Sequence, residues 1–291
     1  PYGKSHELDE KKMEEIKNSE CKYIIIPDAG SSDIKQCKEL KELGKKILIL
    51  DHHGYTDESI RKYATLINCT DGSYPNVNLS GATVVQKTID AFVEKYSKEY
   101  NLNREQRDKY LDLVSLGTIA DSIDLANPEA RYYAVEGLKP KYENNECIKE
   151  ICLQAEYEMK MGKTIKTIGF NIAPCMNAIV RYGKPADEKK GIQSEFEILF
   201  RALINEQETF VYQPRRKCKD DPKPESQYHS LQKTSARLAT NAHSRQSKAV
   251  SILVDKLVDK VDKTSQVVIV NATEDMEDQD KNSTGLVANK L

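Results

Sequence analysis

Two short apolar runs, each leading directly to an acid, constrain the fold of this chain more than any other feature. Residues 23–26 read Tyr-Ile-Ile-Ile and lead through a proline to Asp28, and residues 47–50 read Ile-Leu-Ile-Leu and lead to Asp51. Short runs of branched aliphatic residues indicate buried strands, and the helix-forming segment 33–45 lies between them. Strand, helix and strand at this spacing predict an α/β fold in which helices cover a parallel sheet.

The polar residues after the two runs predict a metal site. Parallel strands end at the same edge of a sheet, where ligands of open α/β sheets gather, so we expect Asp28 and Asp51 to lie side by side with His52 and His53. Such groups are costly to bury unpaired. Carboxylate and imidazole ligands together suit Mn²⁺ or Mg²⁺. A structural zinc is not indicated, because the seven cysteines form no CxxC pair.

A third acidic segment strengthens this prediction. The stretch LGTIADSIDL, residues 116–125, reads as the end of an apolar helix followed by Asp121 and Asp124. Acids near a helix C-terminus cost stability, and a nearby cation would offset that cost. Taken singly, Asp28 also fits a turn residue, the histidines a hydrogen-bonded loop pair, and Asp121 a cap. Their joint placement where strands and a helix end favours the metal site.

Bulk properties limit the possible partners. The net charge is −2, so nucleic-acid binding would have to come from a local patch rather than from the whole chain. No apolar run approaches the length of a membrane span, and no signal peptide is visible. The cysteines are odd in number and scattered, which favours reduced thiols and a cytoplasmic protein.

The remaining sequence predicts three regions. Residues 1–143 form the sheet-containing domain, with a further short strand at 65–70 and helices from residue 80 onward. Residues 144–262 form a helical region with a connecting helix and a charged loop near 213–226, and residues 263–291 begin another α/β domain with a strand at 266–272. The chain starts with Pro1 rather than Met, and we expect both ends to continue in a longer protein.

Four segments, in this order and at this spacing, resemble one known family. PDAGSSD, ILILDHHG, LSGATVV and SLGTIADSIDL resemble the motifs of the DHH phosphoesterase superfamily, and more narrowly of the RecJ-type single-strand-specific exonucleases of the phage-encoded kind. IAPCMNAIVRYG, residues 172–183, resembles a later segment of that family, and NSTGLVANKL resembles the opening of its C-terminal DHHA1 domain.

The resemblance implies a role for each residue of the predicted site. Asp28 resembles the carboxylate that bridges two metal ions, and His52 and Asp121 resemble ligands of the second ion. His53 would face the scissile phosphate as a catalytic donor. Asp51 would orient an imidazole, as carboxylates around metal sites commonly do.

Three further residues are implied to bind the substrate. Asn177 and Arg181 would meet the phosphate backbone. Arg245 lies in the predicted connecting helix, which lines the substrate groove in the family. A basic run at 215–217 is a weaker candidate, because charge runs are more often solvated surface.

The implied activity is two-metal hydrolysis of single-stranded DNA from the 5′ end, in DNA repair or recombination with replication or repair proteins as partners. Two other functions stay open. One is a non-catalytic nucleic-acid-binding or scaffold member of the superfamily. The other is a phosphodiesterase for short oligonucleotides or cyclic dinucleotides.

The sequence departs from the family at its first motif. An Asp-x-Asp pair on the first strand should supply the remaining ligands of the first ion, and the nearest candidates are His6 and Asp9 in the unlike segment GKSHELDE. We therefore expect the chain to begin after this motif, with an exposed sheet edge. By itself it should be inactive or weakly active, with ligands evident only for the second metal.

Overall fold

The structure, a computed structural model, describes residues 8–155, 162–214, 224–261, 269–272 and 280–291. Contacts within the chain divide it into two compact units. Unit 1 comprises Pro1–Asn145 and Lys163–Gly169, and unit 2 comprises Glu146–Gly162 and Phe170–Leu291. The sequence predicts three regions, whereas the contacts give two units. The boundaries of the three regions stay predictions.

Unit 1 contains the predicted parallel sheet. Its strands are β1 (Tyr23–Pro27), β2 (Lys46–Asp51) and β3 (Thr65–Asn68), in the order β1-β2-β3 with both neighbouring pairs parallel. The predicted α/β fold class is confirmed.

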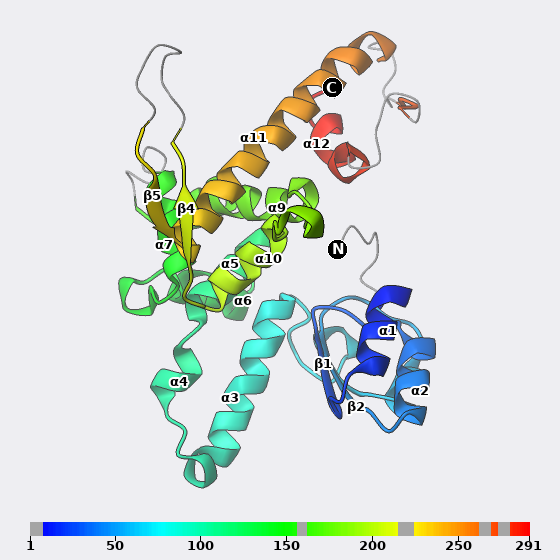
Figure 1. Cartoon of the computed structure of the whole chain (residues 1–291). Coiled ribbons are helices and arrows are strands. Elements are labelled where there is room, and N and C mark those ends of the chain that lie inside the picture. The colour runs from blue at the N-terminus through cyan, green and yellow to red at the C-terminus, as the bar shows by residue number, and fades with distance from the viewer. Residues whose placement is uncertain (1–7, 156–161, 215–223, 262–268, 273–279) are drawn as a thin grey trace. The chain divides into compact units, whose positions relative to one another are not determined.

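One face of the sheet packs on two amphipathic helices. These are α1 (Glu10–Asn18) and α2 (Ile34–Glu42), which lie together on the same side of β1 and β2 (Figure 1). Alternate strand residues such as Ile26, Ile49 and Leu66 bury their side chains in this layer, as the two-residue period of a strand requires.

The other face of the sheet is only partly covered. Leu50 of β2 packs with Leu79 and Val84, at the start of the long helix α3 (Gly81–Tyr100). On β1, by contrast, the side chains of Tyr23 and Ile25 are 69 % and 63 % exposed. Within the described residues β1 pairs with β2 alone, so it forms one edge of the sheet.

Helices complete unit 1. The apolar helix α5 (Leu111–Ala120) lies against α3 and α6. The remaining helices of this unit are α4 (Arg104–Asp108), α6 (Pro128–Glu136), α8 (Ile165–Thr167) and the short helices η1 (Glu58–Lys62), η2 (Cys69–Asp71) and η3 (Pro140–Tyr142). The π-helix η5 (Ile168–Ile172) runs from unit 1 into unit 2.

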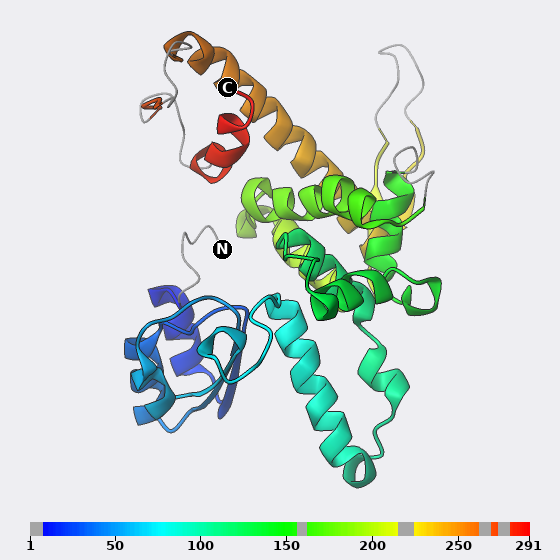
Figure 2. The same ribbon diagram turned by 180° about the vertical axis from the view of Figure 1, so that it is seen from behind.

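Unit 2 is built on one long helix, α11 (Leu231–Leu257). Three helices pack along it: α7 (Glu146–Gln154), α9 (Ala173–Tyr182) and α10 (Glu195–Leu203) (Figure 2). The last turns of α11 form a small apolar core with α12 (Thr284–Ala288). Three short helices complete the unit: η6 (Glu188–Lys190), η7 (Val258–Lys260) and η8 (Asp280–Ser283).

The region expected to be helical also contains a β-hairpin. Strands β4 (Thr209–Tyr212) and β5 (Gln227–Ser230) pair antiparallel, so the charged segment 213–226 connects the two strands. Residues 215–223 of that segment lie outside the described residues. So do residues 266–268 of the strand expected at 266–272, and the described residues 269–272 form no strand. No helix in the described part of the chain is long and apolar enough to cross a bilayer.

Candidate metal centre

Asp28 follows β1 in a left-handed backbone conformation. Its φ is +59°, in the left-handed region that residues other than glycine, asparagine and aspartate rarely adopt. The Asp28 amide donates to the Leu50 carbonyl over 2.8 Å, which anchors this turn to β2. The chain therefore leaves the sheet abruptly, and the Asp28 side chain stays 53 % exposed.

The start of α3 leaves space for this carboxylate. A Cβ atom on Gly81 would lie 2.2 Å from Oδ1 of Asp28, well inside van der Waals contact. Only glycine therefore fits at the first position of α3. This close approach explains the glycine of the LSGATVV motif.

His52 lies between two carboxylates. Its Nε2 atom is 3.2 Å from Oδ1 of Asp28 and 3.8 Å from Oδ2 of Asp121, which follows the last residue of α5. The hydrogen bond to Asp28 raises the pKa of His52, and burial opposes that effect only in part. The His52 ring also makes a hydrogen bond to the backbone of Leu79. Metal-binding imidazoles characteristically use one ring nitrogen for the ion and the other for such a bond.

Asp51 is buried, at 1 % exposure, and organises the loop after β2. Its Oδ1 atom accepts hydrogen bonds from the amides of His52 (2.7 Å) and His53 (3.1 Å) and lies 2.7 Å from Nδ1 of His53. Burial alone would raise the pKa of Asp51, but hydrogen bonds from Ser31 and His53 outweigh it, so the pKa is lowered. The imidazole that Asp51 orients is therefore that of His53.

Two supporting residues were not identified from the sequence. The Ser31 amide donates to Oδ2 of Asp51 over 3.2 Å, and Nδ2 of Asn68 donates to the Ser31 hydroxyl and the His53 carbonyl, each over 2.9 Å. Both side chains are buried. In the sequence, these two residues are marked only by the serine pair in the turn after β1 and by the asparagine that ends β3.

The donor set fits a hard or borderline divalent ion. Ligand atoms of Asp28, His52 and His53 all lie within 4.8 Å of one another, and Asp121 adds a carboxylate beside His52. Within the described residues no Asp-x-Asp pair joins them. Asp9 caps α1 by accepting the Lys12 amide, and His6 lies outside the described residues.

The three residues expected to bind substrate belong to unit 2. Asn177 and Arg181 are exposed and four residues apart on α9, a spacing that puts both side chains on one helix face. Arg245 makes hydrogen bonds to the Tyr182 carbonyl over 3.0 and 3.3 Å and pairs with Glu195. Their roles stay predictions.

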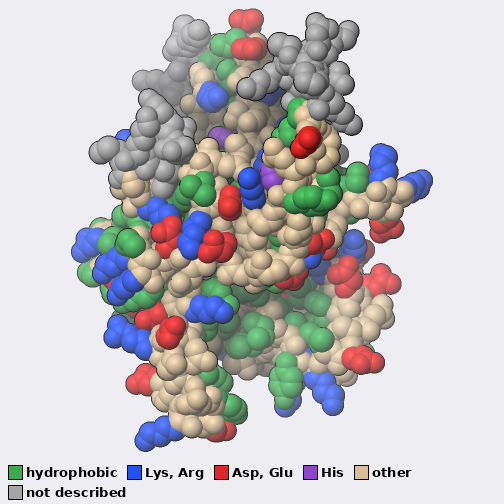
Figure 3. Space-filling model, turned by 60° about the vertical axis from the view of Figure 1, so that its left-hand side comes forward, with side chains coloured by type: hydrophobic (Ala, Val, Ile, Leu, Met, Phe, Trp, Pro, Cys, Tyr) green, Lys and Arg blue, Asp and Glu red, His purple; other side chains and the backbone are tan. Residues whose placement is uncertain are grey.

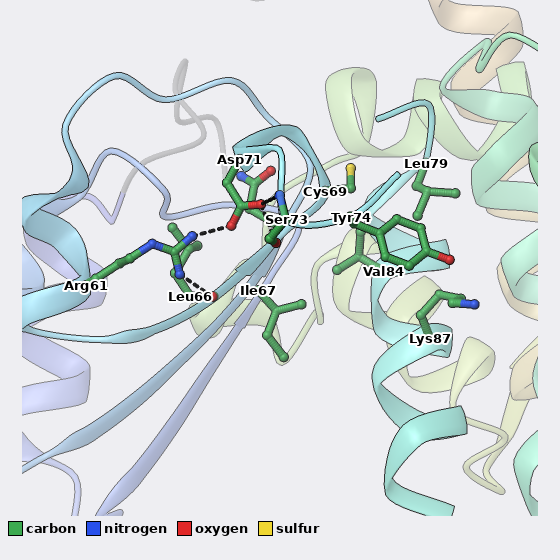
Figure 4. Close-up of a pocket in the computed structure, with 11 residues that line it drawn as sticks. Arg61, Leu66, Ile67, Cys69, Asp71, Ser73, Tyr74, Leu79, Val84 and Lys87 are labelled. Carbon is green, nitrogen blue, oxygen red and sulfur yellow. Dashed lines mark hydrogen bonds and ion pairs between the residues drawn. The ribbon is translucent and has the colours of Figure 1, made fainter. Parts of the chain in front are cut away.

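A pocket of about 330 Å³ lies between β3 and α3 (Figure 4). Its walls include Leu66, Val84 and Tyr74. The two basic side chains that line the pocket form ion pairs. Arg61 pairs with Asp71 and Glu58, and Lys87 pairs with Glu129. Because both basic side chains are paired with acids, the pocket offers an anion little net positive charge. Elsewhere acidic and basic side chains are interspersed over the face shown in Figure 3.

Comparison with known proteins gives concordant matches. The DHH family, N-terminal domain, matches residues 4–118. A protein of Bacillus subtilis, provisionally named an SPbeta prophage-derived single-strand DNA-specific exonuclease (YorK), is 30 % identical over 272 residues. That match covers 92 % of this chain and 43 % of the relative, so this chain spans less than half of the relative's length. The single-stranded-DNA-specific exonuclease RecJ of the same organism is 30 % identical over 175 residues, covering 60 % of this chain and 21 % of RecJ.

Solved structures share the fold. A RecJ exonuclease crystallised with manganese aligns with a TM-score of 0.66 at 20 % identity, covering 97 % of this chain and 60 % of its own. RecJ from Thermus thermophilus in complex with Mn²⁺ aligns with a TM-score of 0.58 at 18 % identity, covering 87 % of this chain and 32 % of its own.

Proposed function

Because this chain is a member of the DHH family and a homologue of RecJ-type exonucleases, we propose that it is the catalytic part of a manganese- or magnesium-dependent phosphodiesterase acting on single-stranded DNA. The observation that carries the proposal is the placement of His52 Nε2 between the carboxylates of Asp28 and Asp121. The relatives' names support the substrate class, and the proposal extends to release of nucleotides from the 5′ end and a cytoplasmic role in DNA repair or recombination.

Asp28, His52 and Asp121 would hold the ion, with oxygen and nitrogen ligands suited to Mn²⁺ or Mg²⁺. A divalent ion there supplies an acidified water and a positive charge beside the phosphate. Asp51 holds the His53 ring through Nδ1, and His53 would donate to a phosphate oxygen as charge develops. On unit 2, Asn177 and Arg181 would bind phosphates along the strand, and Arg245 would support that surface.

The described residues provide ligands for one ion. Two-metal hydrolysis uses two ions to stabilise both the attacking and the leaving oxygen, and one ion alone stabilises them less well. We therefore propose that the 291-residue chain alone hydrolyses DNA slowly.

The test combines metal binding with strand digestion by the purified chain. We expect one tight Mn²⁺ site, and slow Mn²⁺-dependent release of mononucleotides from single-stranded but not double-stranded DNA. Asp121→Ala should abolish both the Mn²⁺ binding and the digestion. Asp124→Ala is the matched control, because Asp124 is exposed and its carboxylate, within the described residues, accepts the nearby Ala126 amide over 2.9 Å.

Three other outcomes would change the proposal. A chain that binds no Mn²⁺ contradicts the metal centre. A chain that binds single-stranded DNA without hydrolysing it supports the scaffold function instead. Preferential cleavage of dinucleotides or cyclic dinucleotides would replace the polymeric substrate with a short one.

A further inference from the structure

We propose that three buried hydroxyl groups, those of Ser80, Thr83 and Thr118, position the metal ligands of unit 1; this inference rests on the proposed function. We call them the hydroxyl cluster. Each of the three residues is fully buried. Ser80 and Thr83 stand at the start of α3 and Thr118 near the end of α5, so the cluster joins the two helices.

Each hydroxyl oxygen of the cluster lies within hydrogen-bond distance of the other two. The Ser80 and Thr83 hydroxyl oxygens lie 3.0 Å apart, those of Ser80 and Thr118 3.2 Å, and those of Thr83 and Thr118 3.0 Å. The Thr118 hydroxyl also donates to the Val114 carbonyl over 2.8 Å, and the Ser80 hydroxyl accepts the Thr83 amide over 3.2 Å. Buried hydroxyls without partners are costly, so removing one member leaves the others under-satisfied.

The two helices meet here at very close range. A Cβ atom on Gly117 would lie 2.7 Å from the Cβ of Ala82, which leaves no space for a larger side chain on either helix. The hydroxyl cluster lies one residue further along both helices, at Thr83 and Thr118. The separation of α3 and α5 is thus set at one point by a steric contact and by hydrogen bonds.

That separation determines where the ligands lie. Ser80 is preceded by Leu79, whose backbone bonds the His52 ring, and followed by Gly81, against which the Asp28 carboxylate lies. Thr118 stands three residues before Asp121, whose carboxylate is 3.8 Å from His52. A shift between the two helices would therefore move the Asp121 carboxylate relative to Asp28 and His52.

A simpler role for the cluster is general stabilisation of the helix pair. The two roles differ in what they predict for metal affinity. A positioning group weakens metal binding in a chain that is still folded, whereas a merely structural hydroxyl lowers stability alone. Residues that orient metal ligands typically change metal affinity by about 10- to 100-fold when they are replaced.

The experiment measures the Mn²⁺ dissociation constant of the full chain by titration, together with the midpoint of urea unfolding. Thr118→Val keeps the side-chain shape and removes the hydroxyl, and we expect it to weaken Mn²⁺ binding about 10-fold or more. Thr118→Ser restores the hydroxyl and should bind Mn²⁺ like the unmodified chain.

Ser115→Ala is the matched control. Ser115 is fully buried on the same helix, but its hydroxyl donates over 2.6 Å to the Ala134 carbonyl of α6, away from α3. We expect this variant to lose a comparable amount of stability without losing Mn²⁺ affinity.

Equal Mn²⁺ affinity in Thr118→Val and the unmodified chain would overturn the inference and leave the metal centre standing. Equal losses in Thr118→Val and Ser115→Ala would also overturn it, because the effect would then be general. If the unmodified chain binds no Mn²⁺, the proposed function itself fails. Should Thr118→Val not fold, Thr83→Val is judged by the same criteria, with Thr83→Ser as its restoring variant.

Discussion

The backbone of Gly81 lies so close to the Asp28 carboxylate that a methyl group on Gly81 would be only 2.2 Å from Oδ1 of Asp28. We expect Gly81→Ala to displace the Asp28 carboxylate or the start of α3 and to weaken Mn²⁺ binding about 10-fold or more. Gly54→Ala is the control, because this glycine follows His53 and a Cβ there meets no atom within 4 Å. Titration with Mn²⁺ measures the affinity of both variants. Equal Mn²⁺ affinities in Gly81→Ala and Gly54→Ala would contradict the steric explanation.

Asp51→Asn should impair both stability and digestion. Asp51 receives four hydrogen bonds from Ser31, His52 and His53, and the asparagine amide would set a donor against one of these donors. We expect the free energy of unfolding to fall by about 1–3 kcal/mol and the rate of DNA hydrolysis to fall further than Mn²⁺ affinity. Asp57→Asn is the control, since Asp57 is exposed and its carboxylate accepts local hydrogen bonds from Ser59 two residues away. Urea unfolding and a strand-digestion assay measure the two effects, and unchanged digestion would exclude a catalytic need for a fixed His53 ring.

Glu129 should contribute a measurable part of the acid sensitivity of this protein. Burial would raise the pKa of Glu129, but hydrogen bonds from Tyr74, Asn76 and Lys87 together lower it below the ordinary value of 4.5. The ionised form therefore stabilises the fold above about pH 4.5, and this stabilisation is lost as the pH falls through the lower folded-state pKa.

Urea unfolding between pH 3 and pH 7 tests this expectation. Glu129→Gln should be less stable than the unmodified chain at pH 7 and should lose less stability on acidification. Tyr74→Phe removes one of the three hydrogen bonds, at 2.7 Å, and should give a smaller change in the same direction. Parallel pH profiles for all three proteins would show that Glu129 has no such role.

Arg245→Ala should destabilise unit 2 whether or not Arg245 meets DNA. It pairs with Glu195, whose side chain is 9 % exposed, and removing the guanidinium would leave that carboxylate almost buried without its cation. Because Arg245 itself is 33 % exposed, we expect a loss of about 1–3 kcal/mol, below the cost for a fully buried pair. Urea unfolding measures this loss of stability, with Lys248→Ala as the control because Lys248 is exposed. Comparable unfolding midpoints for the two variants would show that the Arg245–Glu195 pair is not stabilising.

A loss of DNA binding in Arg245→Ala can therefore come from unfolding as well as from a lost phosphate contact. Salt-dependent binding to oligonucleotides separates the two. In a variant that is still folded, a lost phosphate contact makes the DNA affinity less dependent on salt concentration. Partial unfolding instead lowers the amount of binding-competent protein and leaves this salt dependence unchanged.

The sequence predicts the parallel sheet and the acids at its carboxyl edge, because short aliphatic runs separated by a helical segment are typical of buried parallel strands. Asp28, His52 and Asp121 are brought together in the structure, although their roles as ligands stay proposals. The hydroxyl cluster could not be predicted, because sequence spacing does not say which helices cross or at which residues. Nor could the β4–β5 hairpin, since Gln-Tyr-His-Ser lacks the apolar alternation of a strand.

The left-handed backbone at Asp28 also limits how this position can change during evolution. Aspartate, asparagine and glycine are the residues that tolerate such a φ, yet only aspartate offers an anionic oxygen to a cation. Replacement by asparagine or glycine would keep the turn and give up the carboxylate. Under the proposed function, either replacement would therefore separate the two properties of this position, leaving a folded chain whose ligand set for the ion is incomplete.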